Sequence, residues 1–279
     1  MRSSIEIVAE YRNGRTVLRS IRGGLHFAAR ETGPGVVHLV GTAAGPLGGD
    51  EVTIRVQVGA GARLAVRSAG ATIVQPGRPS PDSRLTLHLD VADEAELDVG
   101  CEPTVICHGA GHESAAVIEL TGSGQVRLLE QVLLGRSGEP GGSWVGRTRL
   151  TRDGVPQLRH TLRSTLITGS GSSISTGSSI SMGGSINTNS SISSGDGTRV
   201  ISTLLWSGAE PAVAATAGTA AAMPLAGGGL LVTATGHTLI ATAHDLRAAA
   251  TASTAAATAV PDRATSAGRP CAAGAGAGS

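Results

Sequence analysis

Three segments of this chain repeat one pattern, and the repeat limits the possible folds more than any other feature. Each copy has two apolar residues at alternate positions, five connecting residues, and two more alternating apolar residues. The copies are Val56–Val66, Leu89–Val99 and Ile118–Leu128, and they start 33 and 29 residues apart. Side chains alternate across a strand, so each copy can bury the same face twice. Repeats of this kind predict stacked β layers, either a sandwich or an irregular β-solenoid.

Further strand signals surround the repeats. Asn13-Gly14 separates the alternating segments Glu6–Tyr11 and Thr16–Arg19, which predicts a tight hairpin. Arg84–Val91 is another period-two strand, and His237–Ala250 has the apolar spacing of a helix. We therefore predict a mainly all-β fold, a layered or irregular β-helix or solenoid-like array of antiparallel strands with a C-terminal helix.

The predicted domain is interrupted by a serine-rich insert. Residues 1–168 and 198–250 form one β-rich domain, and residues 169–197 contain hexamers with an isoleucine every six residues. A hexapeptide β-helix is one interpretation. Ordering a residue costs on the order of 1–2 kcal/mol, whereas one buried isoleucine contributes roughly 1.5–3 kcal/mol. We therefore predict a disordered loop at 169–197, and a disordered tail at 258–279 because little there can be buried.

Composition excludes several classes of function. The 22 basic residues, all arginine, nearly balance 21 acidic ones, and there are four aromatic residues in all. A nucleic-acid interface needs a basic excess or aromatic stacking platforms, so we predict no nucleic-acid partner. Acidic residues interrupt the N-terminal segment, and the apolar stretch 212–235 is rich in Ala and Gly. We predict no signal peptide, no membrane span and a cytoplasmic protein.

Catalytic motifs are missing from the sequence. It has no Gly-x-Ser-x-Gly elbow, no His-Glu-x-x-His and no phosphate loop ending in Gly-Lys. The absence of lysine also removes Schiff-base chemistry. We therefore expect a protein that is not an enzyme.

Asp50 ends the string Gly45-Pro-Leu-Gly-Gly-Asp50, directly before a strand. Three glycines and a proline impose a particular backbone path there. The carboxylate either accepts hydrogen bonds from nearby amides and braces the turn, or it stands beside a cavity and contacts a cation in passing. The sequence leaves both interpretations open.

Cysteine and histidine gather between residues 101 and 112. Cys101, Cys107, His108 and His112 are ligand types that suit nickel or zinc. Adjacent residues of a strand point to opposite faces, so Cys107 and His108 can share a metal only if Gly109 and Gly111 reorient them. The alternative is that Cys107 is a small buried hydrophobic residue.

Glu130 lies in the middle of the apolar strand Leu128–Leu134. A carboxylate in such a strand must face solvent or be paired. Arg136 is the nearest candidate for a structural salt bridge. The alternative role for Glu130 is contact with a metal ion.

The sequence resembles the urease accessory protein D family (UreD, also called UreH). The resemblance rests on Gly45–Thr72, on Glu102-Pro103, and on Glu130 followed by Gly135-Arg136. It implies a non-catalytic, largely β protein that forms a complex with the F-type urease accessory protein and the G-type GTPase. That complex docks on apo-urease and helps deliver nickel to its active site.

Some positions depart from the family pattern. Leu129 stands where the family often has Trp, Cys101 replaces an expected proline, and the serine-rich hexamers have no counterpart. A protein that passes a metal onward should hold it weakly, which favours Asp50 and Glu130 over the Cys/His cluster. The resemblance thus implies nickel in transit and no tightly bound cofactor. Two alternatives remain, a β-rich binding module unrelated to urease and a Gly/Ala/Ser-rich surface repeat protein, although the latter needs an export signal.

Overall fold

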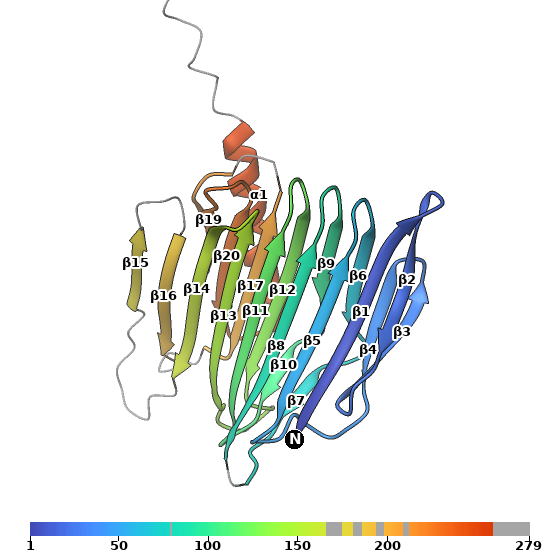
Figure 1. Ribbon diagram of the computed structural model, residues 1–279. Coiled ribbons are helices and arrows are strands. Elements are labelled where there is room, and N and C mark those ends of the chain that lie inside the picture. The colour runs from blue at the N-terminus through green and yellow to red at the C-terminus, as the bar shows by residue number, and fades with distance from the viewer. Residues whose placement is uncertain (79, 166–174, 181–185, 194–197, 209–211, 259–279) are drawn as a thin grey trace, which may run out of the picture.

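Two β-sheets lie one behind the other in the computed structural model (Figure 1). The structure describes residues 1–78, 80–165, 175–180, 186–193, 198–208 and 212–258. Between the sheets lies the main apolar core, built from Val, Ile, Leu and Ala side chains of both layers. A helix, α1 (Leu239–Thr258), packs beside strands of the second sheet.

The two sheets differ in the strands that they contain. The nine strands of the first sheet are, in spatial order, β15 (Ser175–Ile180), β16 (Ile186–Ser193), β14 (Val155–Thr165), β13 (Ser143–Arg152), β11 (Gly111–Leu120), β8 (Asp82–Val91), β5 (Glu51–Val58), β1 (Arg2–Arg12) and β2 (Arg15–Arg22). The second sheet runs β18 (Ala215–Ala217), β19 (Ala220–Pro224), β20 (Leu230–Gly236), β17 (Val200–Ser207), β12 (Gln125–Leu134), β9 (Glu96–Gly100), β6 (Arg63–Ser68), β4 (Val36–Gly41) and β3 (Phe27–Gly33), with β10 (Thr104–Ile106) and β7 (Thr72–Val74) beside β12.

Each of the three sequence repeats is one crossing from the first sheet to the second. They correspond to β5–β6, β8–β9 and β11–β12, and the copies stack in register. Ala92 N–H donates to the carbonyl of Val58, and Thr121 N–H donates to that of Val91, so the connecting turns stack as well. The prediction of an all-β, solenoid-like array with a C-terminal helix is confirmed.

Strand direction is where the prediction fails. The pairs β5·β8 and β8·β11 in one sheet, and β6·β9 and β9·β12 in the other, are parallel. The reason is the crossing itself, because a chain that leaves for the opposite sheet returns in the same direction one coil later. Antiparallel pairs occur toward the ends, as in β1·β2, β13·β14 and β12·β17.

Two tight hairpins lie at these ends, and the one at Asn13-Gly14 was predicted. Asn13 and Gly14 join β1 to β2 with φ angles of 52° and 81°, the left-handed pair that a two-residue turn requires. Asp153 and Gly154, at φ 50° and 76°, join β13 to β14 in the same way.

The serine-rich insert contains strand where we predicted a disordered loop. Segments 175–180 and 186–193 form β15 and β16; β16 pairs in parallel with β14, and β15 pairs with β16. The free backbone edge of β14 offers hydrogen bonds that do not depend on buried side chains, and the prediction counted only buried isoleucine. The rest of the insert lies outside the described residues, and so does the predicted tail beyond residue 258.

The C-terminal helix is longer than the sequence pattern suggested. Thr238 caps its start: its hydroxyl accepts from Ala241 N–H at 3.3 Å. The residues after 250 are mostly Ala and Thr, and alanine has the highest helix propensity, which explains the extension to Thr258. Leu246 and Ala249 are buried against β17–β20, so the helix covers that end of the second sheet.

Candidate functional site: an interior cavity and an outer pocket

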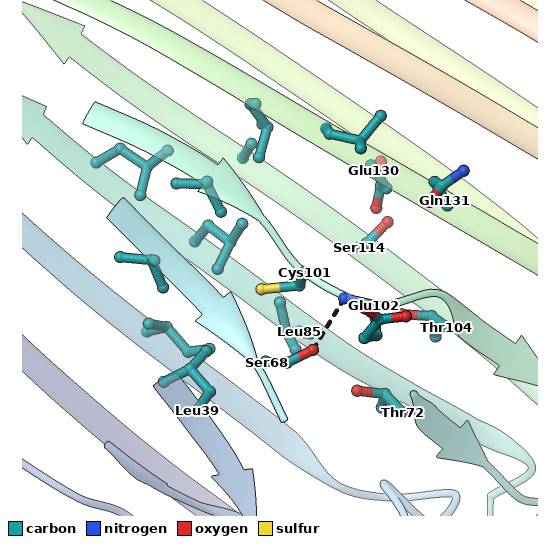
Figure 2. A pocket seen from close by; sticks show the side chains of 18 of the residues that line it. Leu39, Ser68, Thr72, Leu85, Cys101, Glu102, Thr104, Ser114, Glu130 and Gln131 are labelled. Carbon is teal, nitrogen blue, oxygen red and sulfur yellow. Dashed lines mark hydrogen bonds between the residues drawn. The ribbon is translucent and has the colours of Figure 1, made fainter. Parts of the chain in front are cut away.

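A cavity of about 100 Å³ lies between the two sheets (Figure 2). Aliphatic side chains from both sheets surround most of it. One end is polar, and the polar or titratable residues there are Ser68, Thr72, Cys101, Glu102, Thr104, His112, Ser114, Glu130 and Gln131. A water molecule occupies roughly 30 Å³ in the liquid, so the cavity has room for a few waters or one small hydrated ion. We refer to it as the interior cavity.

The interior cavity lies where small side chains of β11 face inward. In two registers of the first sheet, Leu85 and Leu87 on β8 are paired with Ser114 and Ala116 on β11. All four residues line the cavity. The step from leucine to serine and alanine leaves space that a close-packed interior would otherwise fill.

Glu130 supplies the carboxylate of the interior cavity. It occupies an inward position of β12, between the buried Leu128 and Val132, and its side chain points toward Ser114 of the opposite sheet (Figure 2). Burial raises the pKa of Glu130, and the Ser114 hydroxyl offsets part of that rise. The Trp144 indole N–H also donates to the Ser114 hydroxyl at 2.9 Å. Glu130 is therefore a buried carboxyl that borders open space.

The salt bridge that we expected between Glu130 and Arg136 does not form. Arg136 lies beyond the end of β12 and pairs with Glu139, with 3.0 Å between Nη2 and Oε2. Within the described residues Glu130 belongs to no ion pair. The end of the strand explains the difference, because β12 stops at Leu134 and Arg136 lies exposed beyond it, while Glu130 faces inward.

Cys101 also lines the interior cavity, beside Ser68 (Figure 2). Burial raises the pKa of the Cys101 thiol to about 11, although the nearby Arg67 and the Ser68 hydroxyl counteract it. The thiol therefore stays protonated near neutral pH, and a protonated thiol is a poor metal ligand. Ser68 and Ser114 were missed by the sequence analysis. The available signal was a small hydroxyl at an inward position of an otherwise aliphatic strand.

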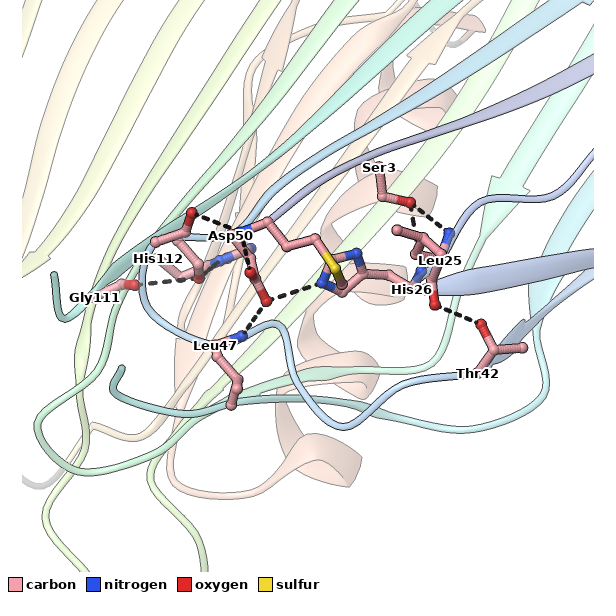
Figure 3. A network of polar contacts seen from close by, with 11 residues as sticks. Ser3, Leu25, His26, Thr42, Leu47, Asp50, Gly111 and His112 are labelled. Carbon is pink, nitrogen blue, oxygen red and sulfur yellow. Dashed lines mark hydrogen bonds and ion pairs between the residues drawn. The ribbon is translucent and has the colours of Figure 1, made fainter. Parts of the chain in front are cut away.

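Asp50 closes the turn before β5 and accepts hydrogen bonds from three directions (Figure 3). Its Oδ2 accepts from Leu47 N–H at 2.9 Å and lies 2.9 Å from Nε2 of His26, and its Oδ1 lies 2.6 Å from the Met1 ammonium. Burial opposes ionisation, but these hydrogen bonds outweigh it and lower the pKa of Asp50 to about 2. The turn-bracing interpretation of Asp50 thus has three contacts behind it.

The glycines of the string serve the same turn. Gly45 and Gly49 have φ angles of 116° and 89°, which side-chain-bearing residues rarely adopt. A Cβ on Gly48 would collide with backbone atoms of Ser80 and Gly77. The string is therefore needed for a close approach between the turn at 45–50 and the residues Gly77, Ser80 and Pro81.

The Cys/His residues of the 101–112 region separate. Cys107 is 3% exposed and packed inward, His108 is exposed at the turn, and His112 faces inward from β11. Gly109, at φ 74°, turns the chain between them. In the part of the chain that the structure describes, no three or more His, Cys, Asp or Glu side chains are grouped so that they could hold a metal ion. Cys107, His108 and His112 thus do not form one site.

His112 has a position that the sequence did not suggest. Its Nδ1 lies 2.9 Å from the Ser83 hydroxyl, and the side chain is 5% exposed. Burial lowers the pKa of His112 to about 4, so the ring is neutral at physiological pH. His112 lines the interior cavity and also a second hollow of about 490 Å³, the outer pocket. The residues that line the outer pocket besides His112 include Asp50, Glu51, Asp82, Ser83, Arg84 and Glu113.

Comparison with known proteins identifies the family. A family model described as UreD urease accessory protein matches residues 1–269. This chain belongs to the UreD family of urease accessory proteins. The protein named urease accessory protein UreD from Frankia alni is 35% identical over 253 residues, which cover 84% of this chain and 80% of that protein. The UreD of a Parafrankia species is 33% identical over 237 residues, 79% of this chain and 78% of its own length.

Other UreD proteins match a shorter region. UreD 1 of Saccharopolyspora erythraea is 37% identical over 168 residues, covering 57% of this chain and 64% of that protein. The resemblance stated from the Gly45–Thr72, Glu102 and Glu130 segments is thus confirmed at the level of the UreD family. Among the described residues, no helix of this UreD protein has the length and apolar character to cross a membrane.

Proposed function

We propose that this UreD protein is a non-enzymatic scaffold for urease maturation. It acts in the cytoplasm, with the F-type accessory protein and the G-type GTPase, on apo-urease, and it assists nickel delivery to the urease active site. Membership of the UreD family supports the urease context. The observation that carries the nickel role is the interior cavity with one buried carboxyl, Glu130, beside water-sized space.

The chemistry of the interior cavity favours transit over storage. Nickel binds well to imidazole and thiolate, and a site with several such ligands would release it slowly. The cavity offers hydroxyls, the buried carboxyl of Glu130, the exposed residue Glu102, a single imidazole at His112, and the thiol of Cys101, which burial keeps protonated. A passing divalent cation would favour loss of the Glu130 proton, so contact and release there are coupled to proton exchange. On this basis no tightly bound cofactor is proposed.

Glu130→Gln tests the proposal. The change keeps the shape of the side chain and removes the charge that a cation would meet. In cells that express urease with its accessory proteins, we expect nickel per urease active site and urease activity to fall together, at unchanged amounts of the UreD protein. Glu119→Gln is the matched control, because Glu119 lies on the exposed face of β11. Normal nickel loading with Glu130→Gln would rule out transit past this carboxyl.

Asp50 needs a separate test, because its contacts indicate a structural role. Asp50→Asn keeps an acceptor for Leu47 N–H while it removes the charge. If Asp50 lies on the nickel route, the Asn variant folds but loads urease poorly. If Asp50 only braces the turn, any loss of loading follows the loss of folded protein.

A further inference from the structure

We propose that the outward face of β13 and β14 is a docking surface for a carboxylate-rich face of a protein partner. The surface consists of Arg147, Arg149, Arg159 and Arg163, and we call it the arginine surface. The inference rests on the proposed scaffold function and adds to it a face of the molecule and the chemistry of the partner. Three observations carry it: the charge of the hairpin, the missing ion pairs, and two like charges that stand opposite each other.

Positive charge is concentrated in the hairpin of β13 and β14, which lie side by side (Figure 1). Residues 143–165 contain five arginines and one acidic residue, Asp153, a net charge of +4, whereas the whole chain carries +1. Four of these arginines alternate with buried residues and so point outward. The fifth, Arg152, donates to the carbonyls of Gly122 and Gly124. The positive charge of the hairpin therefore stands mainly on one face.

Most of the arginine surface lacks an acidic partner. Arg147 shares Glu113 with Arg84, at N–O distances of 3.3 and 3.5 Å. The other three members form no ion pair among the described residues: Arg149, Arg159 and Arg163. The strands beyond β14, which are β16 and β15, contain neither Asp nor Glu. Three guanidinium charges are thus left without compensation from neighbouring strands.

Arg149 and Arg159 stand directly opposite each other in the antiparallel register of β13 and β14. Like charges in that position destabilise a sheet. The partner of Arg149 on β11 is Val117, and the partner of Arg163 on β13 is Val145, so no carboxylate separates the charges. The fold gains nothing from this arrangement, whereas carboxylates of a docking protein would relieve the repulsion.

The arginine surface lies on an open sheet face, which favours a protein partner over a small anion. A small anion needs a concave site, and none of the four arginines lines the interior cavity or the outer pocket. The outward side chains between and beside the arginines are small or apolar and half-buried: Ala115, Val117, Val145 and Thr161. Interfaces between proteins combine an apolar centre of this kind with arginine, which is enriched there.

Acidic residues beside the arginine surface disfavour a nucleic-acid partner. Glu119 on β11 is exposed, and its partner in register on β8 is Asp90. A DNA duplex carries one negative charge per ~1.7 Å of its axis, so it would extend past four arginines and meet these carboxylates. A protein face can place its carboxylates over the arginines alone.

The test compares a double variant, Arg149→Glu with Arg159→Glu, with the matched control Arg55→Glu. Arg55 is exposed on β5, in the same row of the sheet as Arg149, and it also has no ion pair among the described residues. Affinity of the full-length chain is measured for the F-type accessory protein, the G-type GTPase and apo-urease, singly and together. We expect the double variant to bind one of these partners at least about 100-fold more weakly, because two interface arginines are reversed. Arg55→Glu should bind like the wild type.

Salt separates an electrostatic interface from an apolar one. Wild-type affinity for that partner should fall at least about tenfold between about 50 and about 300 mM NaCl, and the double variant should lose most of this dependence. Circular dichroism establishes that each variant is folded. Unchanged affinity of the folded double variant for all three partners would overturn the proposal. Binding of a DNA duplex of about 20 base pairs by the wild type, lost in the double variant, would assign the surface to nucleic acid and overturn it as well.

Arg149→Glu alone measures the repulsion within the arginine surface. It places a carboxylate opposite Arg159, so the midpoint of urea denaturation should rise above that of the wild type. A lower midpoint would show that the arginines stabilise the sheet, and the inference would fail.

Poly-L-glutamate gives a measurement that involves no urease protein. The wild type and Arg55→Glu should bind it alike at about 50 mM NaCl, and the double variant at least about tenfold more weakly. If the wild type binds none of the three proteins but keeps this difference, the proposed partners are wrong and the arginine surface stands. Equal binding of poly-L-glutamate by all three chains would refute the arginine surface itself. Normal urease loading with Glu130→Gln, by contrast, would refute nickel transit and leave this docking surface standing.

Discussion

Removal of the Asp50 carboxylate should unfold the turn that it braces, and the size of the effect follows from its contacts. In Asp50→Ala, Leu47 N–H loses its acceptor, and His26, which is 2% exposed, loses its partner. Breaking a buried charged pair by removing one partner costs about 3–5 kcal/mol. We expect Asp50→Ala to lose an amount at the lower end of that range, because the Asp50 side chain is still 10% exposed.

Asp50→Asn separates the charge from the hydrogen bonds. The pKa of Asp50 falls from 3.8 to about 2 in the folded state. At about 1.4 kcal/mol per pKa unit, the charge contributes at most about 2.5 kcal/mol, and solvent at the outer pocket reduces that figure. A lowered carboxyl pKa stabilises the fold above the unfolded pKa, and that stabilisation is lost as pH falls from about 4 to about 2. The stability gap between wild type and Asp50→Asn should therefore close over that interval.

The assay is urea denaturation at several pH values, with Glu51→Ala as control. Glu51 is the next residue, and its partner Arg2 is 87% exposed, so the control should lose less than about 1 kcal/mol. A loss in Asp50→Ala no larger than in Glu51→Ala would refute the bracing role. A gap between wild type and Asp50→Asn that stays constant down to pH 2 would refute the electrostatic part.

Three further predictions concern the interior cavity and the turn. Glu130→Gln should raise the free energy of unfolding at pH 8 by roughly 1–3 kcal/mol. The reason is that the change removes a buried carboxyl, whose charged form has no ion-pair partner among the described residues and so destabilises the folded chain. Because burial raises the pKa of Glu130, wild-type stability should decline above pH 4.5, and urea titrations of the variant should lack that decline. Burial raises the pKa of Cys101 from 9.0 to about 11, so at pH 8 its thiol should react with iodoacetamide about 100-fold more slowly in the folded chain than in urea. Peptide mass spectrometry can measure both rates. Equal rates would contradict the burial of Cys101. Gly48→Ala should cost about 1–3 kcal/mol in urea denaturation because its Cβ meets backbone, whereas Gly70→Ala, which meets nothing within 4 Å, should be nearly neutral.

The sequence predicted the layers of this fold because its strands alternate so regularly. Arg84–Val91 was predicted as a period-two strand, and its Leu85 and Leu87 lie on one face of β8, beside the interior cavity. Strand direction was not predictable from alternation, since parallel and antiparallel strands bury the same residues. The direction depends on the route of the five-residue connector, which can either reverse the chain within one sheet or carry the chain to the opposite sheet. The small residues of these connectors permit both routes.

The sequence singled out some residues that line the interior cavity, but it did not predict which residues lie together. Glu130 stood out as an acid in an apolar strand, but Ser114 and Cys101, which line the same cavity, are 16 and 29 residues away in the sequence. Contacts between side chains of the two sheets cannot be predicted from the local pattern of apolar and polar residues. His112 was grouped with Cys107 by proximity in sequence, whereas one turn at Gly109 sends the two side chains apart.

The small side chains of Ser114 and Ala116 have a consequence for anyone who engineers this protein. Their neighbours in register are leucines, so a design procedure that rewards packing would replace both with larger aliphatic residues. Filling a void of about 100 Å³ is worth on the order of 2 kcal/mol, at ~24 cal/mol per Å³. The product would tolerate heat better and purify more easily, yet its interior would be closed. If nickel passes through the interior cavity as proposed, thermostability and nickel transit compete for the same space, and a search by melting temperature alone would select against urease maturation.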